Sequence, residues 1–234
     1  MSRNGTARIA GVLYILLVIC GLLYLVYIPS LLIDWNDASL TFLNIERSQG
    51  LFKMEILVAI ASFLIFILLP LVLFKLLHSI NKNAAYLMVL FAWISVPISF
   101  VNILNKFAVL DIIEKAERTK MTLEVTGHNV MFHLEQYAHG LEILQIFWGI
   151  WLLPFGYLVY KSGFLPKIFG LLLMAGCFGY LTTFLGAFLY EGFSSTILAN
   201  IASLPAALGE IGIAFWLLIM GTGKFSFKRA KRSI

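Results

Sequence analysis

The sequence predicts an all-α integral membrane protein, a bundle of six transmembrane helices with both the N and C termini in the cytoplasm. The 234 residues are 61% hydrophobic and only 12% charged, whereas soluble domains are nearer half apolar and a quarter charged. The apolar residues form six runs, each close to the roughly 20 residues that a helix needs to cross the hydrocarbon. Lysine and arginine are concentrated on one side of these runs, and the richer side is expected to be cytoplasmic.

The first predicted span, about 9–28, follows directly after Arg3 and Arg8. A basic N-terminus before an apolar run resembles a signal peptide, but this run is longer than a signal-peptide core and has no obvious small-residue cleavage site. We therefore expect it to remain as a membrane helix. The two cysteines, Cys20 and Cys177, both lie inside predicted spans, where a thiol acts as a small hydrophobe.

The second and third predicted spans, about 56–77 and 84–105, are joined by His78–Lys82, which is short enough to require a tight helical hairpin. Pro70 and Pro97 lie within them and are tolerated, because neighbouring helices satisfy the freed carbonyl groups. After the third span, the sequence "DIIEKAERTKM" keeps helical spacing, which predicts that this helix continues past the bilayer.

The last three predicted spans are about 141–160, 168–190 and 199–221. The first two of them are joined by Lys161–Lys167, which again requires a tight hairpin. Each span must be helical, because lipid offers no hydrogen-bond partners to unpaired backbone N–H and C=O groups. No repeat or separate soluble segment is evident, so residues 1–234 are expected to form a single transmembrane domain.

Basic residues set the expected orientation. The side that holds both termini carries eleven Lys and Arg residues, five of them in the tail 224–232, and the other side carries six. Both termini are therefore expected on the cytoplasmic side of the plasma (inner) membrane, which agrees with an even number of spans. The tail accounts for much of the net charge of +5. We expect it to contact anionic lipid headgroups of the bilayer rather than nucleic acid.

A stretch rich in titratable residues, "HNVMFHLEQYAHGLEILQ", leads into the fourth span. At about 100° per residue, four of its side chains share one helical face: His128, Glu135, His139 and Glu142. The opposite positions are mostly apolar, so we expect this polar face to look inward at other helices. The alternative is a helical extension in water.

Glu210 is the one formally charged residue well inside a predicted span. Placing such a side chain at mid-helix costs about 2.5–3.5 kcal/mol on insertion scales, so it is expected to face the bundle or a watery cavity. Small residues flank it at helical spacing and allow another helix to approach; these are Ala202, Ala206 and Ala214, and a similar row on the fifth span is Ala175, Gly179, Thr183 and Ala187.

Polar groups of four spans therefore gather on the side away from the termini. We expect them to form an outward-facing polar pocket with a proton-responsive Glu210, and the predicted members are Glu210, Glu142, His139, Glu135, Asn102 and Glu55. A buried glutamate near histidine is suited to proton-linked small-solute transport or ligand sensing. Six spans suffice for a small carrier, particularly as a homodimer.

Two alternatives stay open. One is an intramembrane metal-dependent enzyme, with a divalent metal held by His128, Glu135, His139 and Glu142. The sequence lacks the H-E-x-x-H pattern, the paired Glu-x-x-His units of di-iron bundles and the G-x-S-x-G turn of hydrolases, which argues against an enzyme. The other is a structural or lipid-binding role, in which the polar groups only hold helices together.

Three segments resemble a bacterial family of six-span membrane proteins filed as domain of unknown function 4386. They are "RIAGVLYILLVICGL", "WGIWLLPFGYLVYKSGFLPKIFGLLLMAGCFGYL" and "GEIGIAFWLLIMG". The resemblance covers nearly the whole chain, and its most specific part is the hairpin from Trp151 to Pro166. It implies a six-helix protein of a bacterial plasma membrane and carries over no catalytic residue.

Overall fold

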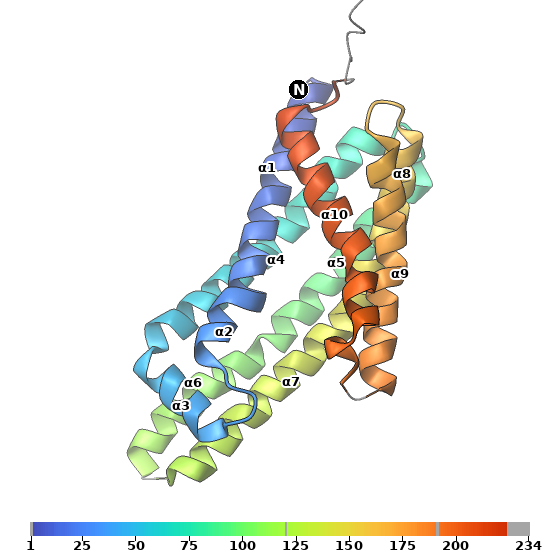
Figure 1. Ribbon diagram of the computed structural model, residues 1–234. Helices are drawn as coiled ribbons and strands as arrows, with labels where there is room; N and C mark the ends of the chain where they lie inside the picture. The colour runs from blue at the N-terminus through green and yellow to red at the C-terminus, as the bar shows by residue number, and fades with distance from the viewer. Residues whose placement is uncertain (1, 120, 191, 224–234) are drawn as a thin grey trace, which may run out of the picture.

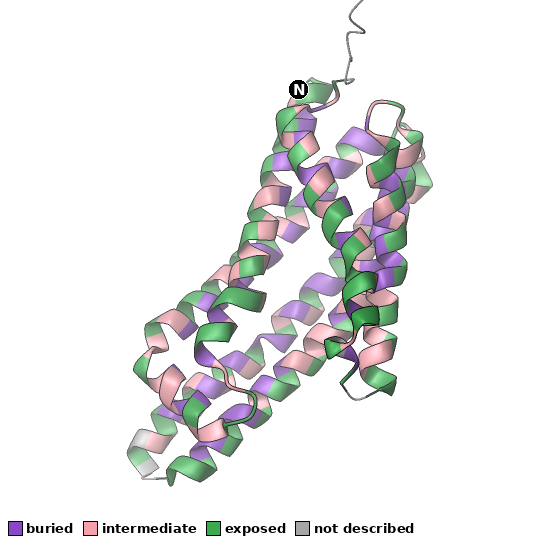
Figure 2. Ribbon diagram, in the orientation of Figure 1, coloured by how far each residue is buried: buried purple, intermediate pink, exposed green. Residues whose placement is uncertain are grey.

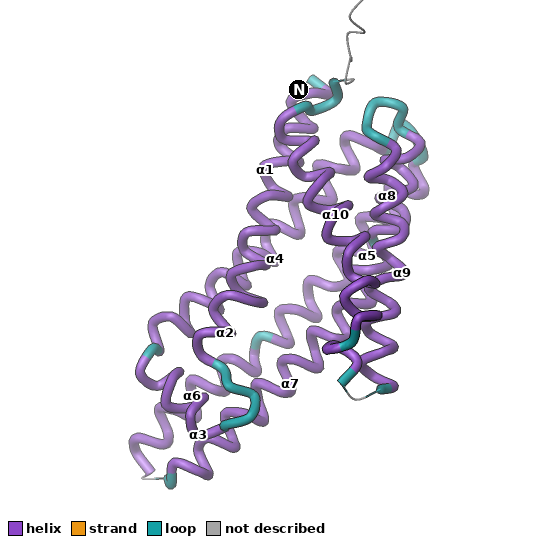
Figure 3. The backbone as a smooth tube through the Cα atoms, in the orientation of Figure 1, coloured by secondary structure: helices purple, strands orange, loops and turns teal. Residues whose placement is uncertain are grey.

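A computed structural model describes residues 2–119, 121–190 and 192–223 (Figure 1). These residues form helices and short connections, with no strand among them (Figure 3). Six helical stretches of the described chain are long and apolar enough to cross a membrane, which confirms the predicted fold class. Their bounds are Arg3–Leu32, Gln49–Leu77, Lys82–Ala116, Leu123–Lys161, Lys167–Leu189 and Ile197–Ile219.

Several of these stretches consist of more than one helical element. The elements in chain order are α1 (Arg3–Leu22), the π-helical turn η1 (Leu23–Tyr27), α2 (Ile28–Leu32), α3 (Ala38–Arg47), α4 (Gln49–Leu77), α5 (Lys82–Asn102), α6 (Leu104–Thr119), α7 (Leu123–Ile150), α8 (Leu152–Lys161), α9 (Lys167–Leu189), the 3₁₀ turn η2 (Phe193–Ser195) and α10 (Ile197–Ile219).

Side-chain caps and prolines explain where helices begin and where they break. Asn81 caps α5 by accepting the N–H of Ala84 at 3.1 Å, and Thr196 caps α10 in the same way. The short break at Trp151 between α7 and α8 precedes Pro154, which has no N–H to donate to the preceding turn. This break and the one at Ile103 each lie inside a single membrane-spanning helical stretch.

The two ends of the described chain lie together. In Figure 1 the start of α1 and the end of α10 meet at one end of the molecule, and the N–H of Thr222 donates to Asn4 Oδ1 at 3.0 Å. Arg3 lies over the ring of Phe164 in the α8–α9 connection, 5.2 Å from its centroid, at the same end as Lys161 and Lys167 on the two sides of that connection. The basic tail 224–232, which we expect to contact anionic headgroups, lies outside the described residues.

Small residues let the last two spans pack closely. A Cβ added at Gly179 would lie 2.0 Å from the carbonyl oxygen of Ala202, and one added at Gly176 would lie 2.7 Å from the Cα of Ala206. The predicted small-residue rows therefore do hold α9 and α10 together. The outer faces of the spans are apolar and exposed (Figure 2), with Phe188 73% exposed, as lipid-facing helices require.

Beyond the bundle, α3, α6 and the first half of α7 pack together, at the end opposite the termini in Figure 1. α3 crosses α7 so closely that a Cβ at Gly127 would lie 2.8 Å from the carbonyl oxygen of Ala38. The helical continuation that the sequence predicted after the third span is confirmed as α6.

Candidate functional site

A cavity of about 480 Å³ lies between α1, α4, α5, α7, α9 and α10. This volume is within the range of pockets that hold small molecules, and such pockets in helical bundles are mostly apolar with a few polar groups. Most of the lining here is aliphatic and aromatic. The carboxyl group of Glu210 and the side-chain amide of Gln145 are two of its polar groups.

Glu210 is held in the cavity wall by two tyrosines from different helices. The hydroxyl of Tyr14 on α1 donates to Oε2 at 2.8 Å, and the hydroxyl of Tyr180 on α9 donates to Oε1 at 3.3 Å. Tyr14 is fully buried, and its ring lies 6.2 Å from those of Trp151 and Phe155, which fixes the direction of its hydroxyl. Helices α1 and α9 thus together orient the carboxyl group of Glu210.

No ion pair involves Glu210 within the described residues. Hydroxyl donors stabilise a carboxylate without neutralising it. The group is therefore suited to accept a proton, or to bind a donor or a cation that enters the cavity.

Gln145 on α7 supplies a second polar contact point in the same cavity. Its Oε1 is buried and has no hydrogen-bond partner among the described protein groups. Leaving such an acceptor unsatisfied costs about 1–3 kcal/mol.

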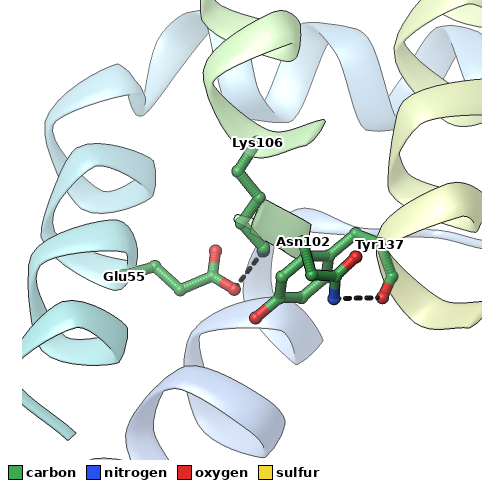
Figure 4. Close-up of polar contacts among 4 residues, drawn as sticks. All are labelled: Glu55, Asn102, Lys106 and Tyr137. Carbon is green, nitrogen blue, oxygen red and sulfur yellow. Dashed lines mark hydrogen bonds and ion pairs between the residues drawn. The ribbon is translucent and has the colours of Figure 1, made fainter. Parts of the chain in front are cut away.

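A second polar cluster, the buried ion pair, lies between α4 and α6 (Figure 4). Lys106 Nζ donates to Glu55 Oε1, and both side chains are 1% exposed. The ammonium also lies 4.6 Å from the ring centroid of Tyr137 and 5.1 Å from that of Phe52. Aromatic faces stabilise a desolvated cation, so these rings help to keep Lys106 charged inside the protein.

Asn102 fastens the end of α5 to α7 beside this ion pair (Figure 4). Its Nδ2 donates to the carbonyl oxygen of Tyr137 at 2.9 Å, and its side chain fits against Gly140, where a Cβ would lie 2.0 Å from Oδ1. Asn105 donates to the Asn102 carbonyl at 3.2 Å, and His133 Nδ1 lies 3.5 Å from Asn105 Oδ1. The α5–α6 break is therefore held by polar contacts rather than left loose.

Two small polar residues of the cavity wall lie on the same membrane-spanning stretches as the buried ion pair. Ser62 and Ser99 line the cavity and lie seven residues along their helices from Glu55 and Lys106 respectively. Tyr24 of η1 also lines the cavity, and its ring lies 6.0 Å from that of Phe63. The two sites are thus separate but adjacent.

The titratable face of α7 points outward. His128, Glu135 and His139 are exposed, and Glu142 is partly exposed. His139 Nδ1 lies 3.5 Å from Glu142 Oε2, and His128 Nδ1 lies 2.8 Å from the Glu124 carbonyl of its own helix. The buried face carries instead Val130, Met131, Leu134 and Tyr137. The prediction that the polar face looks inward is wrong, because the early part of α7 packs its apolar side against other helices and leaves its polar side free.

The six residues predicted to share one pocket are divided among three places. Glu210 lies in the cavity, Glu55 and Asn102 lie at the buried ion pair, and Glu142, His139 and Glu135 lie on the exposed face of α7. Within the described part of the chain no three His, Cys, Asp or Glu side chains come together as a metal site would need, so His128, Glu135, His139 and Glu142 form no ligand set here.

The contacts of Tyr14 and Tyr180 with Glu210, and that of Lys106 with Glu55, were not predicted from the sequence. A tyrosine in the middle of a span is a usable signal, because its hydroxyl needs a hydrogen-bond partner when buried. Which group it meets depends on helix packing, which the sequence of one helix does not contain.

Comparison with known proteins agrees with this description. The model of a family described as "Domain of unknown function (DUF4386)" matches residues 9–221. An uncharacterized protein of Archaeoglobus fulgidus is 38% identical over 81 residues, which cover 35% of this chain and 46% of that protein. The chain therefore spans less than half the length of this relative. No solved structure matches the chain.

Proposed function

Since this chain belongs to the family described as Domain of unknown function (DUF4386), which names no activity, we propose from its own cavity that it binds a small amphipathic molecule inside the membrane, for ligand sensing or proton-linked transport. The observation that carries this proposal is a carboxyl group fixed by two hydroxyls in the wall of a mostly apolar cavity of about 480 Å³. Ionisable groups inside a membrane are expensive and usually serve a function.

The cavity chemistry defines the ligand class. The apolar lining suits an aliphatic or aromatic body, and Glu210 suits a terminal group that donates hydrogen bonds. An amine is favoured over an alcohol, because an ammonium group also neutralises the carboxylate, and charge-assisted hydrogen bonds are about twice as strong as neutral ones. Gln145 is a further polar residue of the cavity wall.

A proton would compete with such a ligand for Glu210. Protonation neutralises the Glu210 carboxyl group, so binding of a proton weakens binding of a cationic ligand, and binding of the cation weakens binding of the proton. This competition supports a proton-linked role. The basic residues at the end that holds the termini support a cytoplasmic position for that end and, with it, a location in the plasma membrane.

Calorimetric titration of dodecylamine into the purified protein in lipid nanodiscs tests the proposal, with titration into empty nanodiscs subtracted. We expect saturable binding to the wild-type protein and affinity about tenfold or more weaker for Glu210→Gln, since a hydrogen bond to a charged group contributes about 1.5–3 kcal/mol. Glu142→Gln is the matched control, because it makes the same chemical change on the exposed face of α7.

Equal affinity of wild type and Glu210→Gln would overturn the proposal. If Glu210→Gln also lowers the thermal unfolding temperature without any effect on binding, Glu210 serves only to hold α1, α9 and α10 together. That result would favour a structural role.

A further inference from the structure

The helices α1 and α10 are packed tightly at the end that holds the termini. A Cβ at Gly11 would lie 2.3 Å from the backbone nitrogen of Leu218, and Asn4 accepts from Thr222. The contact of this tight region that lies farthest from the termini is the hydrogen bond from Tyr14 to Glu210. α1 and α10 are therefore in contact at several points between the termini and Glu210.

Past Glu210 the two helices diverge, as Figure 1 shows. The cavity lining there includes side chains that are also exposed on the outside of the bundle. From the first span these are Leu22, 57% exposed, and Val26, 60% exposed, and from α10 they are Ser203, Ala207 and Ile211. Residues that face both the cavity and the outside mark an opening, which we call the α1–α10 opening.

The depth of this opening places it in hydrocarbon. Ser203 lies six residues from the start of α10 and Ile211 eight residues from its end, which corresponds to about 9 Å and 12 Å along the helix. Neighbouring positions on α10, Leu204 and Leu208, are exposed and apolar. The molecules that meet the opening are therefore lipids rather than water.

The backbone of the first span changes form at the opening. The π-helical turn Leu23–Tyr27 brings Tyr24 into the buried interior, 4% exposed, and leaves Val26 outside. Single π-helical turns within α-helices are frequent at functional sites. Gly21 lines the cavity beside this rim, and a Cβ added there would meet no atom within 4 Å.

We infer that the ligand enters the cavity sideways from the bilayer through the α1–α10 opening, and that it is a single-chain amphiphile whose polar end reaches Glu210 while its chain extends toward the lipid. This inference rests on the proposed function for its ligand and adds the ligand's source and route. An aqueous solute would need a polar path, whereas the rim consists largely of aliphatic side chains.

Fluorescence of Trp151 tests the route. Trp151 lines the cavity yet is only 1% exposed, so a quencher dissolved in the lipid reaches it only by entering the cavity. The protein would keep Trp151 as its sole tryptophan, with phenylalanine in place of the other four. The probe is a long-chain alkylamine with two bromine atoms on its chain, incorporated in the bilayer of a nanodisc.

We expect the brominated amine to quench Trp151, and iodide in the water not to quench it. Ala207→Phe, which narrows the opening, should remove at least half of the quenching by the amine. Leu208→Phe should leave the quenching unchanged, because Leu208 is exposed on the same helix but does not line the cavity. Quenching by iodide, or equal quenching in Ala207→Phe, would overturn the lateral route.

Glu210→Gln separates failure of the route from failure of the proposed function. Quenching that Ala207→Phe blocks but Glu210→Gln leaves intact would support the opening and contradict recognition by the carboxyl group. Quenching that depends on Glu210 but not on residue 207 would contradict the route alone.

Discussion

Removing the ammonium group of Lys106 is expected to destabilise the protein strongly. Lys106→Met keeps an unbranched, apolar side chain of similar length in the same space. It leaves the carboxylate of Glu55, 1% exposed, without a cation. The second carboxylate oxygen, Oε2, already has no hydrogen-bond partner among the described groups, so no other protein contact compensates.

The size of the effect follows from burial. Removing one partner of a buried ion pair costs about 3–5 kcal/mol, whereas replacing both partners by apolar groups is often neutral or stabilising by about 1–4 kcal/mol. We therefore expect Lys106→Met to lose about 3–5 kcal/mol. The double variant Glu55→Leu/Lys106→Met should be more stable than Lys106→Met by at least about 3 kcal/mol, because it contains no isolated buried charge.

Unfolding by SDS in mixed micelles, followed by circular dichroism, measures these free energies. The control is Lys53→Met, which removes an exposed lysine near the start of α4 and should change stability by less than about 0.5 kcal/mol. A loss below about 1 kcal/mol in Lys106→Met would show that Glu55 does not depend on this cation. A double variant whose loss equals the sum of the two single losses would show the same.

Three further outcomes are expected. Gly140→Ala should lower the thermal unfolding temperature, since its Cβ would displace Asn102; Gly50→Ala, whose Cβ meets nothing within 4 Å, is the control and should be neutral or stabilising. Gly179→Ala should destabilise more than Gly140→Ala, because its Cβ meets a backbone carbonyl on α10 instead of a movable side chain; equal losses in unfolding measurements would count against this. Dodecylamine affinity should fall as the pH is lowered, because a protonated Glu210 no longer attracts a cation, and in titrations at several pH values Glu210→Gln should show no such fall.

Hydropathy was enough to predict the six membrane-spanning helical stretches. A run of about 20 apolar residues has few alternatives to a membrane helix, and the short hairpins and small-residue rows follow from local sequence. The six helical stretches and the close packing of Gly176 and Gly179 against α10 confirm this level of prediction. The position of Glu210 facing other helices was also predictable, because lipid excludes a charge.

The partners of the polar groups were not predictable in the same way. The rule that polar faces turn inward holds only where lipid surrounds the helix. The first half of α7 packs with α3 and α6 beyond the bundle, and there Glu135 and His139 face outward. Glu210 meets Tyr14 and Tyr180 through the relative rotation of three helices. The pairing of Lys106 with Glu55 was not predicted, since a lysine near a helix end can reach water as easily as it can turn inward.

Infrared difference spectroscopy on addition of dodecylamine observes the Glu210 carboxyl group itself and therefore decides whether a ligand meets it. We expect a change in the carboxyl and carboxylate bands of the wild-type protein that is absent in Glu210→Gln and retained in Glu142→Gln. Identical difference spectra for wild type and Glu210→Gln would show that no ligand meets this carboxyl group.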